Sequence, residues 1–191
     1  MVKLFFFDCE TTGLDPKKSA MHQMSGMVVI DGNVKERFDI KLRPFDGAEI
    51  SDEALEVSGV TREQIDAYQP HEEAYIDLIS ILCKYVNRYD RSDKFYIVGF
   101  NNAKFDNEFL REFFLRNGDK YFGSWFWANC LDVMILATPA LIAKRPTMEN
   151  FKQGTVAKAL GITLDESKLH DAAYDIDVCK QIFDKVCGIG D

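Results

Sequence analysis

The chain has 191 residues, and its 47% hydrophobic content is enough to bury one sizeable core, so we expect a single domain over residues 1–191. Five cysteines without a C-x-x-C pair argue against a disulfide framework and a zinc site, and no apolar run approaches the roughly 20 residues of a transmembrane helix, which favours a soluble, intracellular, cytoplasmic protein without a membrane partner. A net charge of −8 argues against the broad basic surface that grips a long nucleic-acid duplex.

Three strands open the predicted order of elements. Lys3–Phe7 is an apolar run typical of a buried strand, and Met24–Ile30 and Val34–Leu42 are strand-like runs joined by the Asp-Gly-Asn segment 31–33. An Asp-Gly connection between two such runs is typical of a tight hairpin. We therefore predict three consecutive antiparallel strands.

Two carboxylates, Asp8 and Glu10, stand where the first strand is expected to end. They point to the same face, because strand side chains repeat every second residue. Two close carboxylates raise each other's pKa, and bound divalent cations are a common way to keep both ionised. A lone Asp-x-Glu after a strand is more often an ordinary turn, here leading into Gly13, so the pair needs support from elsewhere in the chain.

Helices are predicted between the third and the fourth strand. Ser51–Val57 and Thr61–Tyr68 each begin with a capping hydroxyl followed by acids, and a longer helix with an apolar stripe begins near Pro70. Phe95–Phe100 is then a buried strand, and Ala103–Arg116 is a helix whose phenylalanines recur about one turn apart. A helix that follows a strand directly begins near the carboxyl end of the sheet, where ligands usually bind.

The last third of the chain completes an α/β pattern. Ala128–Leu131 is expected to form a fifth strand, and Asp132 to cap the helix that follows. Residues 144–155 include a proline and a glycine, which favours a mobile loop. A short helix over 156–160 and a final helix over Asp171–Val186 close the predicted fold.

Three polar segments stand at the ends of these elements: Asp8-Cys9-Glu10-Thr11-Thr12-Gly13, Asn101-Asn102-Ala103-Lys104-Phe105-Asp106 and His170-Asp171-Ala172-Ala173-Tyr174-Asp175. In this order they resemble the three motifs of the DEDDh family of 3′-to-5′ exonucleases. That family includes the proofreading epsilon subunit of bacterial DNA polymerase III, ribonuclease T and oligoribonuclease. The resemblance implies an α/β, ribonuclease H-like fold with a five-stranded mixed sheet flanked by helices.

The resemblance also implies that four acids hold two divalent cations, Mg²⁺ or Mn²⁺. Asp8 would bridge both ions, and Glu10 and Asp175 would complete the site that activates a water. Asp106 would hold the second ion largely through water. Hard oxygen ligands suit these ions, and two such ions can support phosphodiester hydrolysis.

His170 is the candidate general base by the same resemblance. If Asp171 is the N-cap of the last helix, His170 lies outside that helix and can turn toward the metal site, while Asp175 projects from the second turn. An imidazole is well placed to take a proton from water at neutral pH. The other two histidines, His22 and His71, are expected to be surface residues.

Substrate contacts are expected at the turn after Glu10 and in the second motif. The resemblance assigns these contacts to Thr11, Thr12, Leu14 and Asn102, and turn formation and core packing are the alternative roles of the first three. Ser58 and Asn101 stand where relatives of the epsilon subunit often have histidine, which puts their contacts with the substrate strand in doubt. Asp177 is a second acid near Asp175 and is expected to face solvent.

The resemblance implies a metal-dependent 3′-to-5′ exonuclease that hydrolyses single-stranded ends, of DNA, to nucleoside 5′-monophosphates in proofreading, repair or end trimming. One alternative is an RNA-trimming enzyme resembling oligoribonuclease or ribonuclease T. Another is a catalytically inactive nucleic-acid-binding or polymerase-accessory module, although a binding role would not require all four acids and the histidine. Single-stranded DNA or RNA 3′ ends are the expected partners, with a DNA polymerase as a further candidate.

Overall fold

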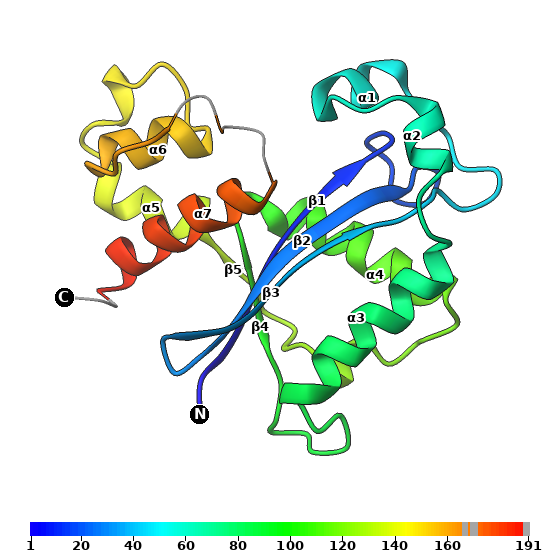
Figure 1. The fold of residues 1–191 in the computed structure, drawn as a ribbon. Coiled ribbons are helices and arrows are strands. Elements are labelled where there is room, and N and C mark those ends of the chain that lie inside the picture. Colours follow the sequence, from blue (N-terminus) through cyan, green and yellow to red (C-terminus); the bar gives the residue numbers. More distant parts are fainter. Residues whose placement is uncertain (166–167, 169–171, 189–191) are drawn as a thin grey trace.

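A computed structural model describes residues 1–165, 168 and 172–188. Within these residues a five-stranded mixed sheet has the order β3-β2-β1-β4-β5 (Figure 1). β1 pairs antiparallel with β2 and parallel with β4, so it lies at the centre of the sheet. The strands are β1 (Lys3–Thr11), β2 (Met21–Ile30), β3 (Asn33–Lys41), β4 (Tyr96–Gly99) and β5 (Leu131–Asp132). The predicted five-stranded mixed sheet is confirmed.

Helices cover both faces of this sheet, with α5, α6 and α7 on one side and α3 and α4 on the other (Figure 1). α1 and α2 lie beside the carboxyl end of β1. The helices are α1 (Asp52–Ser58), α2 (Arg62–Asp66), α3 (His71–Tyr85), α4 (Asp106–Arg116), α5 (Val133–Leu141), α6 (Gln153–Ala159) and α7 (Ala172–Cys187), and the short 3₁₀ turns are η1 (Asn102–Lys104), η2 (Phe122–Ser124) and η3 (Arg145–Thr147).

Local sequence signals explain most of the element ends. Asp31 and Gly32 both have positive φ, as the tight turn between β2 and β3 requires. Ser51 and Thr61 cap α1 and α2 by accepting hydrogen bonds from backbone N–H groups one turn on. Asp132 caps α5 in the same way, as predicted.

Some predicted bounds were wrong. β1 continues to Thr11 instead of ending at Phe7, because its pairing with β2 continues through Glu10 opposite Gln23. The fifth strand begins only at Leu131, and the predicted loop over 144–155 contains η3 and the start of α6. These bounds depend on long-range pairing and packing, which local patterns do not reveal.

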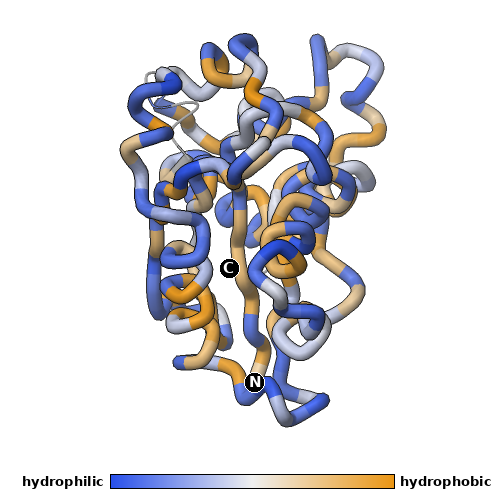
Figure 2. Tube along the Cα trace, turned by 90° about the vertical axis from the view of Figure 1, so that its right-hand side faces the viewer, coloured by the Kyte–Doolittle hydropathy of each residue, from blue (hydrophilic) through white to orange (hydrophobic). Residues whose placement is uncertain are grey.

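The two sides of the sheet hold separate apolar clusters. The cluster under α3 and α4 is rich in aromatic side chains, whereas the cluster under α5, α6 and α7 is mostly aliphatic. Figure 2 shows hydrophobic residues along the central strand and an alternation of hydrophobic and hydrophilic stretches along the helices beside it. No helix within the described ranges is long and apolar enough to cross a bilayer.

Candidate active site

On the side of β1 that faces α7, apolar side chains are followed by acidic ones toward the carboxyl end of the strand. Leu4 and Phe6 belong to the cluster under α7, and the Phe6 ring meets the Phe183 ring edge-on with 5.6 Å between centroids. Asp8 and Glu10 continue the same alternate positions toward the carboxyl end of the strand. The strand therefore carries both carboxylates on its α7 side, which is the face on which the sequence pattern places them together.

Four acids from three distant segments meet at this end of β1. Burial raises the pKa of the Asp8 carboxyl well above its ordinary value, and the charges of three other acids raise it further. These acids are, in decreasing order of effect, Asp106, Glu10 and Asp175. The four acids singled out from the sequence thus lie near enough to one another for three of them to affect the ionisation of Asp8.

Asp106 is held against β1 by hydrogen bonds. It is buried in the first turn of α4, and its Oδ1 accepts from the Cys9 backbone N–H at 3.2 Å and from Cys9 Sγ at 3.4 Å. Burial raises the pKa of Asp106 to about 6, although the hydrogen bonds from Cys9 act in the opposite direction. Two acids in this cluster therefore resist ionisation as long as no cation compensates them.

A second buried acid, Asp132, fixes the loop that leads to Asp106. Asp132 Oδ1 accepts from the Asn101 N–H and the Met134 N–H, both at 3.0 Å, and its Oδ2 accepts from the Ala103 N–H at 3.3 Å. Asn101 itself has a φ of 60°, a left-handed conformation that asparagine tolerates. The sequence pattern predicted the helix cap at Asp132. It missed the loop contacts, because they depend on β4 and β5 lying side by side.

Asn102 is buried inside this loop. Its side-chain amide donates to Asn107 Oδ1 at 3.3 Å, and its own Oδ1 has no hydrogen-bond partner among the described residues. A Cβ atom added to Gly99 would lie only 2.8 Å from the Asn102 side chain, so this glycine permits the close approach. These contacts give Asn102 a structural role, and its contact with substrate stays a prediction.

The turn after Glu10 lines a cavity of about 650 Å³, within the usual range of small-molecule sites. The hydroxyl of Thr11 donates to the Gly13 carbonyl at 2.8 Å, and that of Thr12 donates to the Glu49 carbonyl at 2.7 Å. Leu14 is 84% exposed at the cavity edge, so it is not a core residue. The three predicted substrate residues of this turn therefore share one cavity wall with Glu10.

Ser58 closes the cavity from α1 and contacts Glu10 directly. Its Oγ donates to Glu10 Oε2 at 2.9 Å, and His22 Nε2 lies 3.3 Å from the same Oγ. The expected surface position of His22 was wrong. β2 lies inside the sheet and is covered on both faces, so the His22 side chain is wholly buried.

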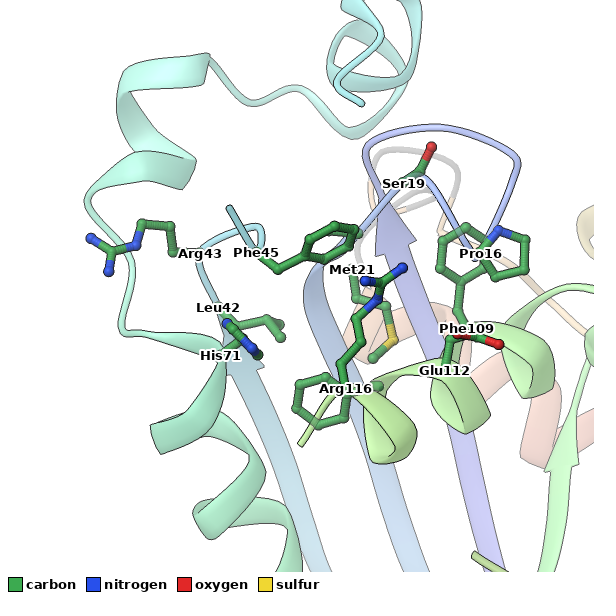
Figure 3. Close-up of a pocket in the computed structure, with 12 residues that line it drawn as sticks. Pro16, Ser19, Met21, Leu42, Arg43, Phe45, His71, Phe109, Glu112 and Arg116 are labelled. Atoms are coloured by element: carbon green, nitrogen blue, oxygen red, sulfur yellow. The ribbon is translucent and has the colours of Figure 1, made fainter. Parts of the chain in front are cut away.

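A second cavity lies beside the same turn but is too small for a nucleotide. It measures about 20 Å³, which is room for about one water molecule. Figure 3 shows the Arg116 side chain reaching the Phe45 ring above it, with the guanidinium carbon 3.6 Å from the ring centroid. His71, also expected at the surface, is half-buried at its edge, with Nδ1 3.3 Å from Glu72 Oε2.

The third motif is described only in part. His170 and Asp171 lie outside the described residues, so the positions predicted for the base and the cap are not tested. Asp175 lies in the first turn of α7, on the helix that covers the acid end of β1. Asp177 is partly exposed, as expected, and forms an ion pair with Arg37 at 2.6 Å.

The chemistry of these acids fits hard divalent cations. All four offer carboxylate oxygens, the ligands that Mg²⁺ and Mn²⁺ prefer. Burial raises the pKa of both Asp8 and Asp106, and neighbouring acids raise it further, so a bound cation would favour the ionised form of both carboxyls. Within the described part of the chain no three His, Cys, Asp or Glu side chains form a ready-made ligand cluster, so a cation would have to draw the carboxylates closer.

A family model described as "Exonuclease" (RNase T) matches residues 5–183. A PolC-type DNA polymerase III of Mycoplasmopsis pulmonis is 26% identical over 179 residues, which cover 93% of this chain and 11% of that protein. Ribonuclease T of Haemophilus influenzae is 27% identical over 190 residues, which cover 92% of this chain and 75% of that protein. The chain thus spans about a tenth of the PolC-type relatives it matches.

Solved structures show the same fold. The zinc-bound E. coli ExoI–ssDNA complex superposes with a TM-score of 0.77 at 22% sequence identity. That match covers 100% of this chain and 41% of the ExoI chain. The ribonuclease H-like arrangement expected from the motifs is therefore present in this chain.

Proposed function

Because the chain belongs to the exonuclease family whose model covers residues 5–183, we propose that it is a 3′-to-5′ exonuclease that releases nucleoside 5′-monophosphates from single-stranded ends. We propose that residues 1–191 act as a single exonuclease domain. The observation that carries the proposal is the charge cluster around Asp8, whose pKa is raised by burial and by three acids from β1, α4 and α7. A cluster of neighbouring carboxylates at a strand end favours bound cations, and phosphodiester hydrolysis is chemistry that two such cations support.

Each acid has a proposed role in holding Mg²⁺ or Mn²⁺. Asp8, Glu10 and Asp175 would hold the ion that activates a water, and Asp8 and Asp106 would hold the second ion. When bound, the two ions supply an activated water and stabilise charge on the phosphoryl oxygens. The chain itself orients these ligands, since Cys9 holds Asp106 and Ser58 holds Glu10 by hydrogen bonds.

The cavity beside Glu10 is the proposed site of the terminal nucleotide. Its volume of about 650 Å³ suits one nucleotide, and Leu14 presents an exposed apolar side chain to a base. The turn of Thr11 and Thr12 offers backbone groups at the proposed position of the terminal sugar. We further propose that Asn102 on η1 contacts the substrate and that His170 acts as the general base.

DNA is the proposed substrate, because the PolC-type relatives are DNA polymerases and the superposed ExoI structure holds single-stranded DNA. The Ribonuclease T relative favours RNA trimming as the second candidate. Turnover of matched DNA and RNA oligonucleotides separates the two candidates. A polymerase partner, proofreading or repair is proposed from the PolC-type relatives alone, and co-purification with a replicative polymerase would test it.

The proposed activity is tested with a 5′-labelled single strand and Mg²⁺. Wild-type protein should leave progressively shorter labelled products, and a 3′-phosphate should block digestion. Asp8→Ala should remain folded and lose essentially all hydrolysis, because no neighbour replaces that ligand. Asp66→Ala, an exposed acid on α2, is the matched control. Normal hydrolysis by folded Asp8→Ala would reject the site, and cutting of circular single strands would indicate an endonuclease.

A further inference from the structure

A chain of three polar side chains runs from inside the sheet to the candidate active site. Glu10 lies on β1, Ser58 ends α1, and His22 lies on β2. Ser58 Oγ donates to Glu10 Oε2 at 2.9 Å, and His22 Nε2 lies 3.3 Å from that Oγ. Ser58 and His22 lie outside the three sequence motifs, so the motifs do not indicate that either residue lies near Glu10.

The direction of the hydrogen bonds follows from proton counting. Ser58 has a single hydroxyl proton, and its two acceptors are Glu10 Oε2 at 2.9 Å and the Ala54 carbonyl at 3.2 Å. The shorter bond to an ionised carboxylate is the stronger one. With its proton directed to Glu10, Ser58 offers lone pairs to His22.

His22 is set up to be the donor. Its ring is wholly buried, and burial lowers the pKa of His22 to about 4, so the imidazole is neutral at neutral pH and carries one N–H. A hydrogen bond to Ser58 places that proton on Nε2. Nδ1 is then an acceptor, and it makes no hydrogen bond within the described part of the chain.

The burial of His22 has a cost that an apolar residue would avoid. A buried ring nitrogen without a partner loses its hydrogen bonds to water, whereas leucine would fill similar space without that loss. Among the described residues, Ser58 is the side chain that forms a hydrogen bond with the ring, and Ser58 in turn contacts Glu10. The hydrogen bond from the His22 ring to Ser58, and through it the orientation of the Glu10 carboxylate, therefore explains a polar ring at this buried position.

We propose that His22 and Ser58 are positioning residues, in which His22 Nε2–H donates to Ser58 and Ser58 in turn holds the Glu10 carboxylate in the orientation that binds a divalent cation. The proposal rests on the metal-dependent function proposed above. A glutamate side chain has several rotatable torsions, so fixing one carboxylate oxygen reduces the freedom that cation binding must remove. Partners of this kind behind a ligand are worth about 10- to 100-fold in metal affinity.

Four variants test the chain of bonds by Mn²⁺ titration, which needs no turnover. Ser58→Ala and His22→Leu remove the two donors and should weaken Mn²⁺ binding about 10-fold or more. Ser58→Thr keeps a hydroxyl, and His22→Gln keeps an N–H donor near the position of Nε2, so both should recover most of the affinity. Ser80→Ala is the matched control, because Ser80 makes the same bond to a carbonyl one turn earlier in α3.

A long-range ¹H–¹⁵N NMR spectrum of the metal-free protein supplies a second measurement, which does not depend on cation binding. His22 should be the Nε2–H tautomer in metal-free protein, and its Nε2 resonance should shift in Ser58→Ala. If His22→Leu does not fold, Ser58→Ala and the spectrum still decide the matter. An Nδ1–H tautomer, or unchanged Mn²⁺ affinity in folded Ser58→Ala, would overturn the proposal.

These outcomes separate the positioning role from the function. If wild-type protein hydrolyses oligonucleotides and Ser58→Ala binds Mn²⁺ as tightly as wild type, the positioning role is rejected and the exonuclease function is retained. If Ser58→Ala binds Mn²⁺ more weakly but wild-type protein hydrolyses no oligonucleotide, the positioning role is retained and the exonuclease function is rejected.

Discussion

The two faces of β1 carry different kinds of side chain. On the side of α3 and α4, which we call the aromatic face, Phe5, Phe7 and Cys9 are buried up to the end of the strand. On the side of α7, which we call the acidic face, buried Leu4 and Phe6 give way to Asp8 and Glu10. The comparison indicates that the aromatic face supplies stability, and that burial of acids on the acidic face costs stability at the place where cations are proposed to bind.

The largest expected effect is on the rate and concerns the proposed general base, His170. His170→Gln keeps size and a hydrogen-bonding group but not basicity, so kcat should fall roughly 10²- to 10⁴-fold while the fold and Mn²⁺ binding remain. The wild-type rate should rise with pH through the histidine titration, and the variant should lose that inflection.

The matched control for this change is His71→Gln, at the edge of the small cavity in Figure 3. Its rate and pH profile should stay those of the wild type. A near-wild-type rate and an unchanged profile for His170→Gln would leave His170 without a catalytic role.

The next effect should be on stability and concerns the aromatic face. The wholly buried Phe5 ring packs against the rings of Phe38, Phe95 and Phe126, so Phe5→Ala should lower the free energy of unfolding by about 3–5 kcal/mol. Urea unfolding measures the change. Tyr89→Ala, at a side chain 89% exposed, should change it by less than about 0.5 kcal/mol. Equal effects of the two variants would contradict the division between the faces.

The smallest effect should be the pH dependence of the metal-free protein. The pKa of Asp106 is near 3.8 in the unfolded chain and about 6 in the folded one, so the folded state binds more protons between these values. Its contribution to stability is therefore fully present in acid and is lost as the pH rises from about 4 to about 6. The loss amounts to at most about 3 kcal/mol, and the raised pKa of Asp8 adds to it in the same direction.

The titration of His22 changes stability in the opposite direction. Its pKa is about 4 in the folded protein and 6.5 in the unfolded chain, so its contribution to stability is lost as the pH falls from 6.5 to about 4. This contribution is common to samples with and without Mg²⁺. The stabilisation by Mg²⁺ should therefore be larger at pH 7 than at pH 5, and Asp8→Asn should abolish most of it. Thermal unfolding with and without Mg²⁺ measures the difference, and equal stabilisation at both pH values would contradict the prediction.

The sequence predicts best where one short segment decides the outcome. The hairpin follows from two residues with positive φ, Asp31 and Gly32, and the caps at Ser51 and Asp132 need only a side chain and the next turn. The convergence of the four acids was predicted from the order of the motifs, which the resemblance supplied.

Contacts across the sheet could not be predicted in this way. His22 precedes the predicted strand Met24–Ile30, whereas β2 begins at Met21 and is buried along nearly its whole length, and Ser58 meets Glu10 across 48 positions of sequence. Asp132 likewise reaches Asn101 only because β4 and β5 are paired. Each of these depends on the position of a strand within the sheet, a property of the whole fold.

β1 and α7 together also set the moment in synthesis at which the acid cluster can exist. A chain emerges from its N-terminal end, so Asp8 and Glu10 are made early, whereas Asp175 on α7 is made after all five strands. A nascent chain that stops before α7 contains three of the four acids and lacks the helix that packs over them. The cluster of four acids is therefore complete only after α7, the last described helix, has been synthesised.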